Sequence, residues 1–82
     1  MKLEDRILSC FSANQWVSMA DIISLFPEVK YSTIRSIFYI LRKKDFIRTR
    51  ALIGKNGGLI HNSYQYTITE KGRKRIFELI PL

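Results

Sequence analysis

Residues 18–47 read SMADIISLFPEVKYSTIRSIFYILRKKDFI, and two helical patterns separated by a turn make this the stretch that decides the fold. Ser18 is placed to cap the first helix, and Asp21 three residues later can complete a capping box. Apolar side chains then recur on one helical face, and Pro27 ends the pattern. The members of that face are Met19, Ile22, Ile23 and Phe26.

The second pattern predicts a helix over residues 32–44. Its apolar side chains follow the i, i+3, i+4, i+7 spacing of a buried stripe, formed by Ile34, Ile37, Phe38 and Leu41. Ser32 is a candidate cap for the start of this helix. Lys43 and Lys44 suit the negative end of its dipole, and Asp45 stands where the helix should end.

The flanking residues complete the order of elements. A short helix is expected over residues 3–12, a β-prone pair at 16–17, and two strands at 46–53 and 59–68 joined by the turn Gly-Lys-Asn-Gly-Gly. Thr69 is a further capping residue, and a last helix follows it. Helix, short strand, helix, helix, hairpin and helix together predict an α+β, winged helix-turn-helix fold. It has a three-helix core, a two-stranded β-hairpin wing and a C-terminal helix, in one domain spanning residues 1–82.

The charge of the chain is concentrated in the middle of the sequence. The net charge is +7, and residues 30–50 hold seven Lys and Arg side chains against Asp45 alone. A basic block on one helix and the following strand favours a polyanionic partner, although a solvated basic face gives the same pattern.

Other function classes find little support in the composition. A single His, a single Cys and scattered carboxylates predict no enzyme, no metal site and no cofactor. The sequence has no apolar run long enough to span a bilayer and no signal peptide, so no membrane role and a cytoplasmic location are expected. No small-molecule substrate is evident.

Two motifs resemble the winged-helix regulators of the MarR and PadR families. The first runs from Met19 to Ile47, although Phe38 and Asp45 replace a Leu and a Gly that are usual there. The second, Tyr66-Thr67-Ile68-Thr69-Glu70-Lys71-Gly72-Arg73, is similar to the element that closes the wing in PadR-like proteins. The resemblance implies sequence-specific binding of double-stranded DNA by a transcriptional regulator.

The same resemblance implies which residues contact the DNA. Helix 32–44 would enter the major groove, with the outward side chains Ser32, Thr33, Arg35, Ser36, Tyr39, Arg42 and Lys43. Arg35 is the best candidate for a base contact, whereas Arg42 and Lys43 suit phosphates. The wing, residues 48–64, would lie on the backbone or in the minor groove, with Arg48, Arg50, Lys55 and Asn56 as candidates.

A homodimer is expected because the first and last helices offer more apolar surface than a small core needs. The candidate interface residues are Leu3, Ile7, Cys10, Phe11, Ile76, Phe77 and Ile80, of which Phe11 and Ile76 are also candidates for the monomer core. Cys10 is either a small buried side chain or half of a disulfide between subunits.

Two other binding functions remain open on sequence grounds. One is a winged-helix protein–protein interaction module that does not bind DNA, and the other is a domain that binds structured RNA. Phosphate binding loses affinity steeply as salt rises, whereas apolar docking does not, so salt dependence separates the first of these from DNA binding.

Overall fold

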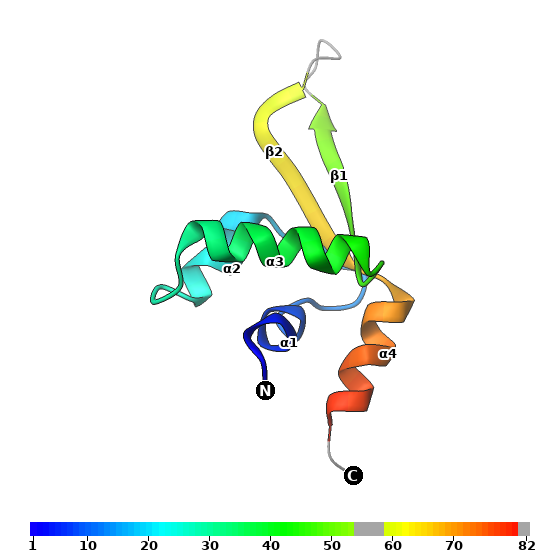
Figure 1. Ribbon diagram of the computed structural model, residues 1–82. Coiled ribbons are helices and arrows are strands. Elements are labelled where there is room, and N and C mark those ends of the chain that lie inside the picture. Colours follow the sequence, from blue (N-terminus) through cyan, green and yellow to red (C-terminus); the bar gives the residue numbers. More distant parts are fainter. Residues whose placement is uncertain (54–58, 81–82) are drawn as a thin grey trace.

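Four helices and one antiparallel hairpin form the part of the chain that the computed structural model describes, residues 1–53 and 59–80. Side chains are described for residues 1–51 and 64–80. The order of elements is the one expected from the sequence: α1 (Leu3–Leu8), α2 (Met19–Leu25), α3 (Tyr31–Lys43), β1 (Ile47–Ile53), β2 (Leu59–Ile68) and α4 (Glu70–Leu79). Figure 1 shows the hairpin rising on one side of α3, with α1 and α4 on the other side.

Local signals at the helix ends explain where α2 begins and where α3 ends. The capping box is present, since the Asp21 amide donates to Ser18 Oγ (3.1 Å) and the Ser18 amide donates to Asp21 Oδ2 (3.0 Å). After α3, Asp45 has a φ of 62°, and the Phe46 amide donates to the Leu41 carbonyl at 2.9 Å. This is the Schellman arrangement, in which Asp45 takes the left-handed position that glycine usually fills.

Two helix boundaries differ from the sequence expectation. Helix α3 begins at Tyr31 with Lys30 as its N-cap, so Ser32 lies within the first turn and does not cap the helix. Helix α1 ends at Leu8, earlier than expected, and the Ser9 hydroxyl donates to the Asp5 carbonyl at 2.8 Å. Such a hydroxyl contact competes with continued helix, and the turn that follows brings Phe11 back to the core.

The core lies between α3 and the elements on either side of it. The stripe of α3 is buried as predicted, and Phe38 is its largest member. The Phe38 ring meets Tyr66 of β2 edge-on, with 4.7 Å between ring centroids, and tilts against Phe11 at 5.9 Å. Through these contacts, both the hairpin and the segment after α1 pack against α3.

The sheet has two chemically different faces. Ile47 pairs with Ile68 and Thr49 with Tyr66 on the face that packs against α3, whereas Arg48 pairs with Thr67 and Arg50 with Gln65 on the outer face. The register becomes irregular between Ala51 and Ile53. Val17 extends the sheet beside β2 as a single bridge residue, with two backbone hydrogen bonds to Tyr66. The β-prone pair at 16–17 predicts this pairing.

Two ion pairs hold α1 against its neighbours. Lys44 Nζ, just after α3, lies 2.7 Å from Glu4 Oε1. Arg75 Nη2 of α4 lies 3.4 Å from Oδ2 of the buried Asp5. Both contacts join segments that are far apart in sequence, so they fix where α1 sits relative to α3 and α4.

Candidate nucleic-acid interface

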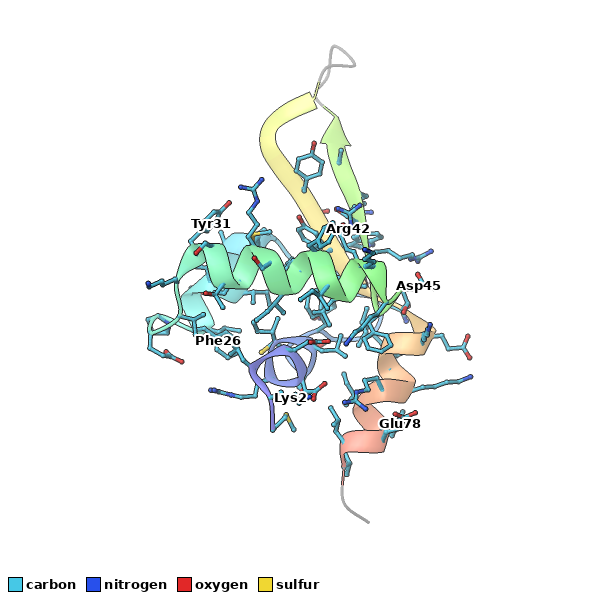
Figure 2. The ribbon with its side chains drawn as sticks, in the orientation of Figure 1. Lys2, Phe26, Tyr31, Arg42, Asp45 and Glu78 are labelled. Atoms are coloured by element: carbon cyan, nitrogen blue, oxygen red, sulfur yellow. The ribbon has the colours of Figure 1, made fainter. Side chains whose placement is uncertain are left out.

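The outward face of α3 gathers the candidate DNA-binding residues of that helix on one surface. Because the apolar stripe faces the core, the polar side chains point to solvent along the length of the helix (Figure 2). All of the residues expected there are exposed: Ser32, Thr33, Arg35, Ser36, Tyr39, Arg42 and Lys43. We call this set the α3 surface.

The α3 surface is positively charged and carries several hydrogen-bond donors. Helix α3 contains no acidic residue, and its first turn has no capping side chain. The Ser36 hydroxyl donates to the Ser32 carbonyl at 3.0 Å. The Lys43 ammonium lies 5.7 Å from the centre of the Tyr39 ring, which places a cation over an aromatic face. The potential of this surface therefore suits an anion.

Two exposed apolar side chains belong to the same region and were missed by the sequence analysis. Ile40 is 38% exposed and, with Arg35, Ser36 and Tyr39, lines a shallow hollow on the helix. Tyr64 is 48% exposed and follows the alternation of Tyr66, so it lies on the sheet face that packs against α3. The position of Ile40 outside the buried stripe, and the Tyr-x-Tyr alternation, were the signals available in the sequence.

Arg48 and Arg50, the wing candidates on β1, lie apart from the α3 surface. The alternation of β1 turns them to the outer face of the sheet. Arg50 donates through Nε (2.9 Å) and Nη2 (2.7 Å) to Gln65 Oε1, and its guanidinium carbon lies 4.1 Å from the centre of the Trp16 ring. Lys55 and Asn56 lie outside the described residues.

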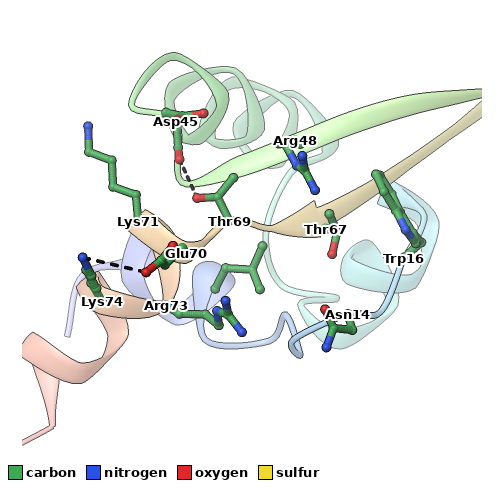
Figure 3. A pocket seen from close by; sticks show the side chains of 11 residues that line it. Asn14, Trp16, Asp45, Arg48, Thr67, Thr69, Glu70, Lys71, Arg73 and Lys74 are labelled. Carbon is green, nitrogen blue, oxygen red and sulfur yellow. Dashed lines mark hydrogen bonds and ion pairs between the residues drawn. The ribbon is translucent and has the colours of Figure 1, made fainter.

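A polar hollow lies below Arg48 and Trp16, between the outer face of the sheet and the start of α4 (Figure 3). Its volume is about 630 Å³. Four of its lining side chains are basic and two are acidic. The lining residues are Asn14, Trp16, Asp45, Arg48, Thr67, Ile68, Thr69, Glu70, Lys71, Arg73 and Lys74. We call this feature the basic hollow.

The expected dimer surface is smaller than the sequence analysis supposed. Ile7 and Phe11 are core residues, with 0% and 5% of their surface exposed, so they offer nothing to a second subunit. Phe77 (73% exposed) and Ile80 (50% exposed) remain open to solvent. The other three candidates are half-buried against the core: Leu3, Cys10 and Ile76.

The Cys10 thiol, two residues after the end of α1, is bonded back to that helix. Its sulfur donates to the Arg6 carbonyl at 3.4 Å, and it is half-buried. Burial raises the pKa of this thiol, and the nearby Arg6 charge opposes the rise. The thiol therefore stays protonated at neutral pH, which makes it a poor nucleophile.

The described residues contain neither a metal-binding cluster nor a membrane-spanning helix. Among the side chains described, those of residues 1–51 and 64–80, no group of three His, Cys, Asp or Glu is placed to hold a metal ion. None of the four helices described has the length and apolar character needed to cross a bilayer.

The fold is shared with solved structures of bacterial regulators. Bacillus subtilis PadR, solved in complex with operator DNA, superposes with a TM-score of 0.77 and 26% identity over 98% of this chain and 48% of its own. A PadR-like transcription factor from Bacteroides fragilis gives 0.75 and 22% identity, over 94% of this chain and 75% of its own. A PadR-like regulator from Bacillus cereus superposes with a TM-score of 0.69 and 21% identity, over 93% of this chain and 75% of its own.

These similarities confirm the winged-helix fold and the resemblance to PadR-like regulators at the level of structure. The chain spans about half the length of the Bacillus subtilis protein (48%). No protein-family model matches the sequence. No curated protein matches it either.

Proposed function

We propose that this protein binds double-stranded DNA through the α3 surface and regulates transcription. The observation that carries the proposal is the exposed face of α3, which presents cations and hydroxyl groups with no acidic side chain among them. The similarity to a PadR protein solved with operator DNA supports it, because the matched region covers 98% of this chain and therefore includes α3.

The dimensions of α3 agree with insertion into the major groove. A helix of 13 residues is roughly 20 Å long, and the major groove of B-DNA admits one helix. Arg35 lies in its N-terminal half, where base edges are usually contacted, and its guanidinium can bind a guanine through two hydrogen bonds. Arg42 and Lys43 near the other end hold backbone phosphates, which positions the protein without reading sequence.

The hydroxyl and aromatic side chains complete the proposed contact surface. Ser32, Thr33 and Ser36 are short enough to reach phosphates or base edges, and the exposed Tyr39 suits a phosphate or a thymine methyl group. The sequence between β1 and β2 includes Lys55 and Asn56, and on sequence grounds we extend the proposal to a wing contact with the backbone or minor groove.

We further propose that the protein acts as a homodimer in the cytoplasm. A twofold axis would place two copies of α3 about 34 Å apart, one turn of B-DNA, on a pseudo-palindromic site. The exposed Phe77 and Ile80 of the C-terminal region support a subunit contact there.

The test is the affinity for a mixed pool of labelled duplexes, measured across a salt series. Binding should be sub-micromolar at low salt, and log K should fall steeply with log salt as phosphates are neutralised. Arg35→Ala should weaken binding by about 1–3 kcal/mol. The matched control is Lys2→Ala, because Lys2 is an exposed cation at the start of α1, away from α3 (Figure 2).

The opposite result has a definite meaning. Weak binding that does not respond to salt would contradict DNA binding and would favour docking to another protein. Equal losses for Arg35→Ala and Lys2→Ala would show that total charge, rather than the α3 surface, is responsible.

A further inference from the structure

We propose that the basic hollow is a second binding site, separate from the α3 surface, for a small phosphate-bearing anion. The site would be additional to DNA binding and does not depend on it. The proposal rests on the position of the hollow, on its uncompensated charge and on its size.

The position of the hollow separates it from the DNA-binding face. Arg48 and Thr67 line it from the outer face of the sheet, which is the face opposite the one that packs against α3. Asn14 and Trp16 form one side, and the first turn of α4 forms another (Figure 3). A duplex that lies on the α3 surface would therefore leave the hollow open.

The charges around the hollow do not cancel. Lys74 Nζ lies 4.0 Å from Glu70 Oε1, so this lysine is already paired. Among the side chains described, neither Arg48 nor Arg73 has a carboxylate within ion-pair distance. The two arginines come from different elements, β1 and α4, and both line the same hollow. The positive end of the α4 dipole adds to their field.

The arginines and the size of the hollow together define the class of ligand. A guanidinium binds phosphate oxygens through two parallel hydrogen bonds, and more than one guanidinium favours a ligand with more than one negative charge. A volume of about 630 Å³ falls within the range of small-molecule sites, roughly 300–1,000 Å³. Asp45 and Glu70 also line the hollow and offset part of its positive charge, which leaves two more basic than acidic side chains.

Trp16 provides a direct probe of the site. It is the single tryptophan of the chain, it lines the hollow, and Arg50 lies over its ring. We would titrate the full chain with inorganic pyrophosphate at constant ionic strength and follow the Trp16 fluorescence, with calorimetry for the stoichiometry. The expected result is a saturable change at one pyrophosphate per chain.

Variants distinguish this site from the α3 surface. Arg48→Gln and Arg73→Gln should each weaken pyrophosphate binding about tenfold or more, because each removes charge-assisted hydrogen bonds. Both side chains are exposed, so both variants should remain folded, which circular dichroism would verify. Arg35→Gln should lose DNA affinity and bind pyrophosphate as the unmodified chain does.

Three outcomes would overturn the proposal. One is a fluorescence change that does not saturate, and another is unchanged binding by Arg48→Gln and Arg73→Gln. The third is displacement of pyrophosphate by a short duplex in the unmodified chain, because this would assign the hollow to the DNA-binding surface. Failure of DNA binding alone would leave the pyrophosphate result unaffected.

Discussion

Arg35 differs from the other cations of α3 in its place on the helix. It lies in the N-terminal half and borders the hollow that Ser36, Tyr39 and Ile40 also line, whereas Arg42 lies in the last turn. The guanidinium of Arg35 can contact a base edge, whereas that of Arg42 is better placed to hold a phosphate. The shape of the side chain, and not only its charge, should therefore matter at residue 35.

We predict that Arg35→Lys and Arg42→Lys have different effects. Both substitutions keep the charge, so both should leave the salt dependence nearly unchanged. Lysine lacks the planar, preorganised fork with which a guanidinium binds guanine, so Arg35→Lys should lose about 1–3 kcal/mol of discrimination at one base pair. Competition between a selected duplex and its single-base variants measures this loss. A loss of discrimination in Arg42→Lys, with none in Arg35→Lys, would reverse the two roles.

The sequence predicted which side chains of α3 are exposed, and the reason is physical. Helical periodicity assigns each residue to the core or to solvent. Once the four residues of the buried stripe are known, the residues of α3 on the opposite face must point to solvent. Alternation along β1 places Arg48 and Arg50 on the face opposite Ile47, but it does not tell which part of α3 the Ile47 face contacts. That choice depends on the tertiary contact between Phe38 and Tyr66, which no local pattern contains.

The junction between β2 and α4 explains why a Thr-x-x-Gly sequence closes the wing. Thr69 Oγ1 accepts from the Gly72 amide at 3.0 Å and donates to the Asp45 carbonyl at 2.6 Å. The Thr69 amide donates to the Phe46 carbonyl at 3.0 Å. One residue thus caps α4 and ties its start to the end of α3. The capping role was predictable from sequence, but the bonds to residues 45 and 46 were not, because they join distant segments.

Gly72 is required by close packing at this junction. A Cβ atom at Gly72 would collide with the Phe46 carbonyl oxygen and come within 2.8 Å of Ile68 Cγ1. We predict that Gly72→Ala lowers the free energy of unfolding by about 1–3 kcal/mol, despite the better helix propensity of alanine. Urea unfolding measures this change, with Lys74→Ala as a control on the exposed face of the same helix. Equal stability of both variants would contradict the close packing.

At the scale of the whole molecule, the apolar residues expected at the dimer surface divide between the core and an exposed C-terminal end. Ile7 and Phe11 are buried by α3 and its neighbours, which leaves Phe77 and Ile80 as the open part of the expected dimer surface. Figure 1 shows α4 running away from the hairpin, on the side of α3 opposite the wing. A contact between two copies of α4 would therefore leave both wings and both copies of the α3 surface free. The sequence alone could not separate the buried pair from the exposed pair. Helical spacing shows that a residue lies on an apolar face, but it does not show whether that face packs against the same chain or against a second one.

We predict that Phe77→Asp converts a dimer into a monomer, which sedimentation equilibrium measures. A charge placed within an apolar contact costs several kcal/mol unless it is paired, and Phe77 is the most exposed aromatic side chain described. Leu25→Asp is the matched control, because Leu25 is a 60% exposed apolar residue on α2 and should leave the dimer intact. The monomer should keep its affinity for a single half-site and lose affinity for a palindrome, since linked half-sites gain from effective concentration. An unmodified chain that sediments as a monomer would refute the dimer, and it would leave DNA binding by the α3 surface to be judged on the salt series alone.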